Sequence, residues 1–272
     1  MVIDDPDDPR IADYRVALGG ATPDTFVAEG RLVVRRLLEG TRHRVRSVLL
    51  TPAALTDLTS ALARQPPALA VFVASTAVIR AVLGFKFHRG CLALGERGRP
   101  ASPDEIITPH GPRVLLVLEE LADPDNVGAV FRNAAAFGAR GVLLSPGCAD
   151  PLYRKALRVS MGATLSVPFA RTEPASGLRA LRAAGYTLVA LTPDRGAEDI
   201  AAVAGRGWPS ARLALLLGAE GAGLSERARQ AADHCVRIAM APGVDSLNVA
   251  TACAIALHRL AGGRGGIMSG EP

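Results

Sequence analysis

The chain has 272 residues, 49% of them hydrophobic, and this length and composition predict a globular protein of two domains. Its longest uncharged apolar stretch, around residues 247–257, is too short and too interrupted to cross a bilayer, so we expect no membrane segment. The net charge of +5 and the isoelectric point near 9.4 favour a polyanionic partner.

The positive charge lies outside the first ten residues, which carry net −3, whereas residues 11–112 carry net +5 and residues 113–272 net +3. Of the 31 basic residues 29 are arginine, and genomic base composition could explain that preference, although it does not explain the net sign. The four cysteines are scattered, without a C-x-x-C pair or neighbouring histidines. We therefore expect reduced thiols, a cytoplasmic protein and no metal site.

In chain order, residues 1–10 are acidic and broken by proline, unlike a secretory leader, and predict a disordered tail. Residues 11–98 are typical of a small α/β domain. We expect a helix from Arg31, strands at 45–51 and 70–74, and helices at 53–63 and 75–83.

A basic loop follows at residues 84–90, where Lys86, His88 and Arg89 alternate with two phenylalanines before a strand. This mixture suits contact with phosphates and unpaired bases. The alternative is an exposed basic turn whose phenylalanines cap the core. Residues 99–112 are rich in proline and glycine and predict a linker between domains.

From residue 113 to 263 the pattern changes to strands that alternate with helices, and residues 264–272 predict a flexible end. Short apolar runs of this kind fit strands buried on both faces, so we expect a mainly parallel sheet covered by helices. Strands are predicted at 114–118, 141–144, 187–191, 212–217 and 235–238, and helices at 127–137, 152–159, 178–184, 225–231 and 247–260.

Three polar segments follow predicted strands, at the edge where open α/β sheets build their ligand sites. The first runs from Asp123 through Asn126 to Arg132, and its side chains can cap the helix that begins there. Arg132 could clamp a phosphate, but a lone helix arginine is more often simply solvated.

The second segment carries glycines at 218, 221 and 223, which let the backbone approach a ligand closely. It matches neither the dinucleotide-binding fingerprint nor a P-loop, so nicotinamide and nucleoside triphosphate chemistry are disfavoured. In the third segment Ser246 is predicted to cap a helix, with Asn248 in its first turn; capping alone would need no function. The sequence contains no Ser/His/Asp arrangement near these segments, so we do not expect a hydrolase with a catalytic triad.

Taken in order, these segments resemble the three motifs of the SpoU (TrmH-type) branch of the SPOUT superfamily, RNA ribose 2′-O-methyltransferases that use S-adenosylmethionine. Residues 123–138 resemble the first motif, residues 218–224 the second, and residues 238–250 the third. The N-terminal domain resembles the ribosomal-protein-like substrate-binding domain that precedes many such catalytic domains.

The resemblance implies an α/β fold whose C-terminal parallel-sheet domain is a trefoil knot, an exception to the rule against threaded chains. It also implies a homodimer with the pocket near the interface, acting on structured RNA, rRNA more than tRNA, without metal. The cofactor would be held by Leu191, Thr192, Gly218, Glu220, Gly221, Ile238, Met240, Ser246 and Leu247.

By the same resemblance the catalytic residues are Arg132, Asn126, Glu220, Ser246 and Asn248, and the RNA-binding residues are Arg132, Arg158, Lys86, His88 and Arg89. Arginine stays protonated in water and is a poor base, so we expect Arg132 to bind a phosphate and stabilise the developing 2′-oxyanion. The alternative is an RNA-binding protein that keeps the fold without turnover.

Overall fold

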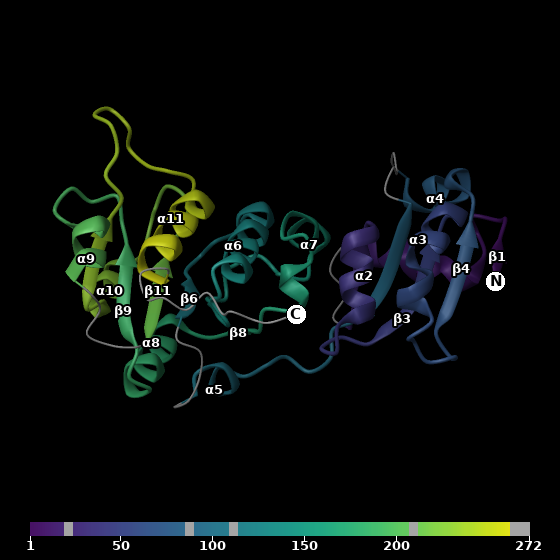
Figure 1. Cartoon of the computed structure of the whole chain (residues 1–272), viewed down its shortest axis with the longest axis horizontal. Coiled ribbons are helices and arrows are strands. Elements are labelled where there is room, and N and C mark those ends of the chain that lie inside the picture. The colour runs from purple at the N-terminus through teal and green to yellow at the C-terminus, as the bar shows by residue number, and fades with distance from the viewer. Residues whose placement is uncertain (19–23, 85–89, 109–113, 207–211, 262–272) are drawn as a thin grey trace. The chain divides into compact units, whose positions relative to one another are not determined.

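The computed structural model describes residues 1–18, 24–84, 90–108, 114–206 and 212–261, and within them the chain forms two units. The first unit contains Met1–Pro100 and Asp150–Ser166. The second contains Ala101–Ala149 and the chain from Val167 onward. Both units combine strands and helices (Figure 1).

A mixed five-stranded sheet forms the centre of the first unit, in the order β1-β4-β3-β5-β2. β1, β4 and β3 are parallel, and β5 runs antiparallel to both β3 and β2. The strand bounds are β1 (Val2–Ile3), β2 (Thr25–Glu29), β3 (Val45–Leu50), β4 (Ala70–Ala74) and β5 (Cys91–Glu96). The helices are η1 (Pro9–Ile11), α1 (Ala12–Leu18), α2 (Arg31–Glu39), α3 (Pro52–Leu62), α4 (Thr76–Leu83), α7 (Arg154–Val159) and η2 (Ala163–Leu165).

The acidic N-terminus differs from the disordered tail that its sequence predicts. β1 pairs in parallel with β4, the Met1 ammonium donates to the Val71 carbonyl oxygen at 2.8 Å, and Ile3 is 1% exposed. A strand of two apolar residues, Val2 and Ile3, is thus enough to extend the sheet, because the open edge of β4 supplies the backbone partners.

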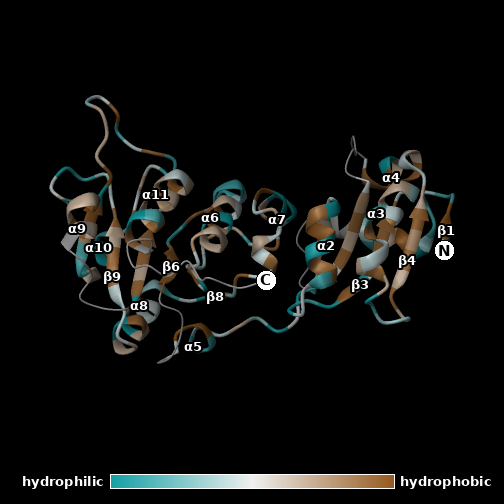
Figure 2. Cartoon of the chain, in the orientation of Figure 1, coloured by the Kyte–Doolittle hydropathy of each residue, from teal (hydrophilic) through white to brown (hydrophobic). Residues whose placement is uncertain are grey.

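Amphipathic helices cover this sheet. In α2, Val33, Val34, Leu37 and Leu38 are buried while the arginines beside them are exposed. The same contrast is visible in Figure 2, where α2 mixes brown and teal and the strands β3 and β4 are mostly brown.

All pairings in the seven-stranded sheet of the second unit are parallel, in the order β10-β12-β9-β11-β6-β7-β8. The strand bounds are β6 (Val114–Leu118), β7 (Val142–Leu144), β8 (Phe169–Arg171), β9 (Thr187–Leu191), β10 (Glu198–Asp199), β11 (Leu213–Leu217) and β12 (His234–Arg237). The helices are α5 (Pro103–Ile106), α6 (Pro124–Ala136), α8 (Pro174–Ala183), α9 (Ile200–Arg206), α10 (Glu226–Ala231) and α11 (Val249–Ala261). The parallel sheet predicted from the sequence is thereby confirmed.

The central strand β11 is buried along its whole length. Ala214 and Leu216 join a core cluster with α8 and α10, and the side chains between them point to the opposite face of the sheet. Helix α6 packs against α11, and its residues Val127, Val130, Phe131 and Ala134 are fully buried. That apolar stripe fixes the rotation of α6 about its axis and leaves Arg132 exposed.

Candidate active site

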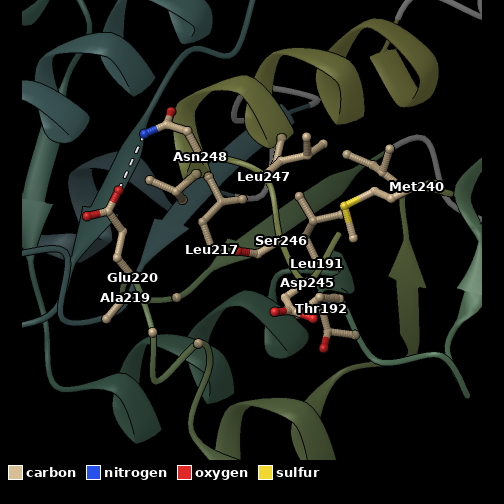
Figure 3. Close-up of a pocket in the computed structure, with 17 residues that line it drawn as sticks. Leu191, Thr192, Leu217, Ala219, Glu220, Met240, Asp245, Ser246, Leu247 and Asn248 are labelled. Atoms are coloured by element: carbon tan, nitrogen blue, oxygen red, sulfur yellow. Dashed lines mark hydrogen bonds between the residues drawn. The ribbon is translucent and has the colours of Figure 1, made fainter. Parts of the chain in front are cut away.

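Four loops follow the carboxyl ends of β6, β9, β11 and β12, which meet at one edge because the strands are parallel. Three of these loops and the start of α11 surround a cavity of about 590 Å³ (Figure 3). It is lined by Leu191, Thr192, Pro193, Leu217, Gly218, Ala219, Glu220, Gly221, Gly223, Ile238, Met240, Asp245, Ser246, Leu247, Asn248, Val249 and Ala252.

The glycine loop, which we define as residues 218–224, folds back closely on itself. The Gly223 amide donates to the Ala219 carbonyl oxygen at 2.9 Å. A Cβ placed on Gly218 would lie 2.1 Å from the Gly223 carbonyl carbon and 2.2 Å from the Leu224 nitrogen. Only glycine fits at position 218, and the exposed backbone of the loop becomes a wall of the cavity.

Three side chains from distant parts of the sequence meet beside the cavity: Asn126 in the first turn of α6, Glu220 in the glycine loop and Asn248 just before α11. Asn126 Nδ2 donates to Glu220 Oε1 at 2.7 Å, and Asn248 Nδ2 donates to Asn126 Oδ1 at 2.9 Å. Asn248 Nδ2 also donates to Glu220 Oε1 at 3.3 Å, the contact drawn as a dashed line in Figure 3. The Glu220 carboxylate is thus oriented by two amide donors.

Asn248 also holds the start of helix α11. Its Oδ1 accepts from the amides of Ala250 at 3.0 Å and Thr251 at 3.3 Å, the pattern of an N-cap. The prediction that Ser246 caps this helix is therefore wrong by two residues, and Ser246 instead lines the cavity. Asn133 Nδ2 donates to the Ala250 carbonyl oxygen at 2.7 Å and ties α6 to the same turn.

Asn126→Asp tests the three-residue network with an almost isosteric change. The substitution replaces the amide that donates to Glu220 Oε1 at 2.7 Å by a carboxylate. Two carboxylates would then face each other and repel. We expect the catalytic efficiency of the methyl transfer that the resemblance implies to fall about 10- to 100-fold, since disrupting hydrogen bonds to a charged group costs roughly 1.5–3 kcal/mol. Asn126→Ala should cost less, and steady-state kinetics that rank the two in reverse order would contradict the network.

The charge of the cavity wall is one-sided. Its ionisable side chains among the described residues are Glu220 and Asp245, both acidic, and the other side chains of the wall are apolar or neutral. Figure 3 places Glu220 at one end beside Asn248, Met240 at the other, and Asp245 next to Thr192. The cavity therefore suits a ligand that combines positive charge with apolar surface.

The sequence-predicted site residues fall into three groups. All nine residues predicted to hold the cofactor line the cavity. Among the predicted catalytic residues, Asn126, Glu220 and Asn248 are in contact and Ser246 lines the wall, whereas Arg132 lies outside it. Lys86, His88 and Arg89 lie outside the described residues.

Arg132 is exposed on α6, and its guanidinium makes no hydrogen bond or ion pair within the described ranges. Arg158, on α7, is half-buried and likewise has no side-chain partner there. Both guanidinium groups are available for a ligand that the structure does not contain.

Two acidic residues of this region escaped the sequence interpretation. Asp245 lines the cavity directly before Ser246, and Glu119, at the end of β6, is buried and bonds to Ser225. A carboxylate directly after an apolar strand is the signal that could have identified Glu119.

Across the described part of the chain, no helix is long and apolar enough to cross a membrane. Within the same ranges no group of three or more histidine, cysteine, aspartate or glutamate residues could hold a metal ion.

Residues 113–258 match the SpoU rRNA Methylase family. The chain is similar to an uncharacterized tRNA/rRNA methyltransferase of Mycobacterium bovis, with 41% identity over 93% of this chain and 89% of the relative. It is 35% identical to a 23S rRNA (guanosine-2′-O-)-methyltransferase of Vibrio cholerae over 62% of this chain and 68% of that one.

Among solved structures, an rRNA methyltransferase of Sinorhizobium meliloti with bound AdoMet has a TM-score of 0.79, at 26% identity over 95% of this chain and 96% of that one. The cavity at the strand ends lies within the matched residues. The chain therefore belongs to the SpoU rRNA methylase family.

Proposed function

We propose that this chain transfers a methyl group from S-adenosylmethionine to the 2′-hydroxyl of a ribose in rRNA. The observation that carries the proposal is the cavity, whose wall combines the second and third motifs with the loop after β9 and whose Glu220 is held by Asn126 and Asn248. The relatives that are named as rRNA ribose methyltransferases support this substrate.

The cavity fits S-adenosylmethionine in size and charge. Its volume of about 590 Å³ is within the usual range for ligands of this size. A sulfonium and an ammonium group give the molecule net positive charge, which Glu220 and Asp245 complement. When bound, S-adenosylmethionine supplies an electrophilic methyl group. The backbone N–H and C=O groups of Leu191, Thr192, Gly218 and Leu247 would hold S-adenosylmethionine by hydrogen bonds.

Arg132 is proposed to bind a phosphate beside the target ribose and to stabilise the developing charge on its 2′-oxygen. The guanidinium stays protonated in proteins and cannot act as a general base, so the hydroxyl proton passes to phosphate or water. Glu220, Ser246 and Asn248 orient the reacting groups, since they lie at the cavity edge.

We further propose a homodimer with a knotted catalytic domain. The sheet order places β12 beyond β9, yet α11, which follows β12, packs against α6. Residues 238–248 must therefore cross past the loops that follow β9 and β11, and a threaded crossing is the rare topology that the family resemblance implies. In a dimer, Arg132, which lies outside the cavity of its own chain, would be able to reach the cavity of the partner chain.

Residues 11–98 are proposed to bind the substrate RNA and residues 113–263 to catalyse. The predicted linker at 99–112 is shorter than expected, because the second unit begins at Ala101 and α5 buries Ile106 in its core. The net charge of +5 on residues 11–112 supports this division, because phosphate contacts dominate the affinity for RNA. We also propose a cytoplasmic location, which the four free cysteines support.

Incubation with methyl-labelled S-adenosylmethionine and ribosomal RNA tests the function. We expect label in the RNA at a single nucleotide position, and digestion of the RNA should release the label as a 2′-O-methylnucleoside. Transfer RNA in a parallel reaction distinguishes the substrates. RNA binding without labelled ribose would overturn the proposal in favour of a non-catalytic RNA-binding protein.

A further inference from the structure

Glu119 is a buried carboxylate that does not line the cavity. It follows β6 directly and is 8% exposed. A buried carboxylate is tolerated when its oxygens accept hydrogen bonds, so its partners indicate what it stabilises.

Both carboxylate oxygens accept from one residue. The Ser225 amide donates to Glu119 Oε2 at 2.8 Å, and Ser225 Oγ donates to Glu119 Oε1 at 2.7 Å. The same hydroxyl accepts from the Ala228 amide at 3.1 Å, which makes Ser225 the N-cap of α10. Glu119 therefore fixes Ser225 in both position and orientation.

The backbone of Glu119 holds the other end of the glycine loop. Its amide donates to the Leu217 carbonyl oxygen at 2.9 Å. Leu217 and Ser225 are the residues on either side of the glycine loop, so one residue closes its base. Gly218, Ala219, Glu220, Gly221 and Gly223 of this loop line the cavity.

We propose that Glu119 is a positioning residue for S-adenosylmethionine, acting through the glycine loop, an inference that rests on the proposed function. Because the loop folds back tightly, a shift of Ser225 moves the whole segment. The Glu220 carboxylate would then lose its alignment with Asn126 and Asn248, which hold it at 2.7 and 3.3 Å. Glu119 thus sets the cavity wall without touching the ligand.

Glu119→Gln is the test. The glutamine side chain keeps one acceptor oxygen, but its NH2 group replaces the other and faces one of the two Ser225 donors, so one of the two hydrogen bonds is lost. We expect the Kd and KM for S-adenosylmethionine to rise about 10- to 100-fold, the range for a charged hydrogen-bond pair, with the KM for RNA unchanged. Glu226→Gln is the matched control, since Glu226 lies on α10, the helix that Ser225 caps, is exposed and bonds to Arg229 and Gln230.

Titration calorimetry with S-adenosylmethionine and steady-state kinetics give the readouts, and circular dichroism reports folding. If Glu119→Gln does not fold, Ser225→Ala removes the hydroxyl contact alone and should still raise the Kd above that of the control. Wild-type affinity in a folded Glu119→Gln or Ser225→Ala protein, or an equal rise in both KM values, overturns the inference. Absence of binding to the wild-type protein would instead contradict the proposed function.

Discussion

Replacing Arg132 by alanine is expected to lower kcat for methyl transfer by about 100- to 1,000-fold, the usual effect of removing one group that stabilises a developing oxyanion. The Kd for S-adenosylmethionine should stay near the wild-type value, because Arg132 does not line the cavity. Single-turnover transfer of label to RNA, together with calorimetry, separates these two quantities.

Arg140→Ala is the matched control, since Arg140 is also exposed and follows the same helix. Arg132→Lys keeps the charge but loses the planar fork that holds a phosphate bidentately, so we expect an intermediate rate. A lysine variant with near-normal turnover would show that bidentate geometry is not essential. An alanine variant that is as active as Arg140→Ala would remove Arg132 from the mechanism.

Gly218→Ala should abolish measurable binding of S-adenosylmethionine. The added methyl group would lie 2.1 Å from the Gly223 carbonyl carbon, and backbone cannot rotate away as a side-chain end does. The glycine loop must shift, and with it the cavity wall. Gly196→Ala is the control, because the nearest atom to its Cβ is Asp194 Oδ1 at 3.5 Å. Calorimetry that finds wild-type affinity in Gly218→Ala would contradict this account of the loop.

Mixing the Arg132→Ala and Gly218→Ala proteins tests whether Arg132 serves the cavity of a partner chain in the proposed dimer. In a mixed dimer, the Arg132→Ala chain keeps an intact cavity and the Gly218→Ala chain keeps its arginine. Recovery of activity after unfolding and refolding the mixture is expected if Arg132 serves the partner's cavity. A mixture as inactive as its components would place Arg132 in the same chain as the cavity it serves.

The parallel sheet could be predicted because its strands are buried on both faces and therefore appear as short apolar runs. β6 and β9 have the bounds 114–118 and 187–191 that the sequence predicts. The edge strands β8 and β10 were missed, since three and two residues are too few for a pattern. β2 was missed because its apolar residues run directly into α2.

The site was predictable as far as the motifs reach. Asp123 caps α6 as expected, with its Oδ1 accepting from the Asp125 amide at 2.9 Å. The position of Glu119 directly after an apolar strand is a signal in the sequence, but its role was not predictable, because that role depends on Ser225, 106 residues later in the chain. Nor does the sequence determine that Arg132 lies outside the cavity, because this depends on how α6 packs, including the contact of Phe131 with Phe169, whose ring centroids are 5.7 Å apart.

Asn248 joins two tasks in one amide group. Its oxygen starts helix α11, and its nitrogen contacts Asn126 and Glu220 at the cavity. Ligand binding and the order of the first turn of α11 are therefore thermodynamically linked, and the amides of Ala250 and Thr251 should exchange hydrogen more slowly when the cavity is filled. Natural selection for a stable chain and for a working enzyme acts on the same side chain.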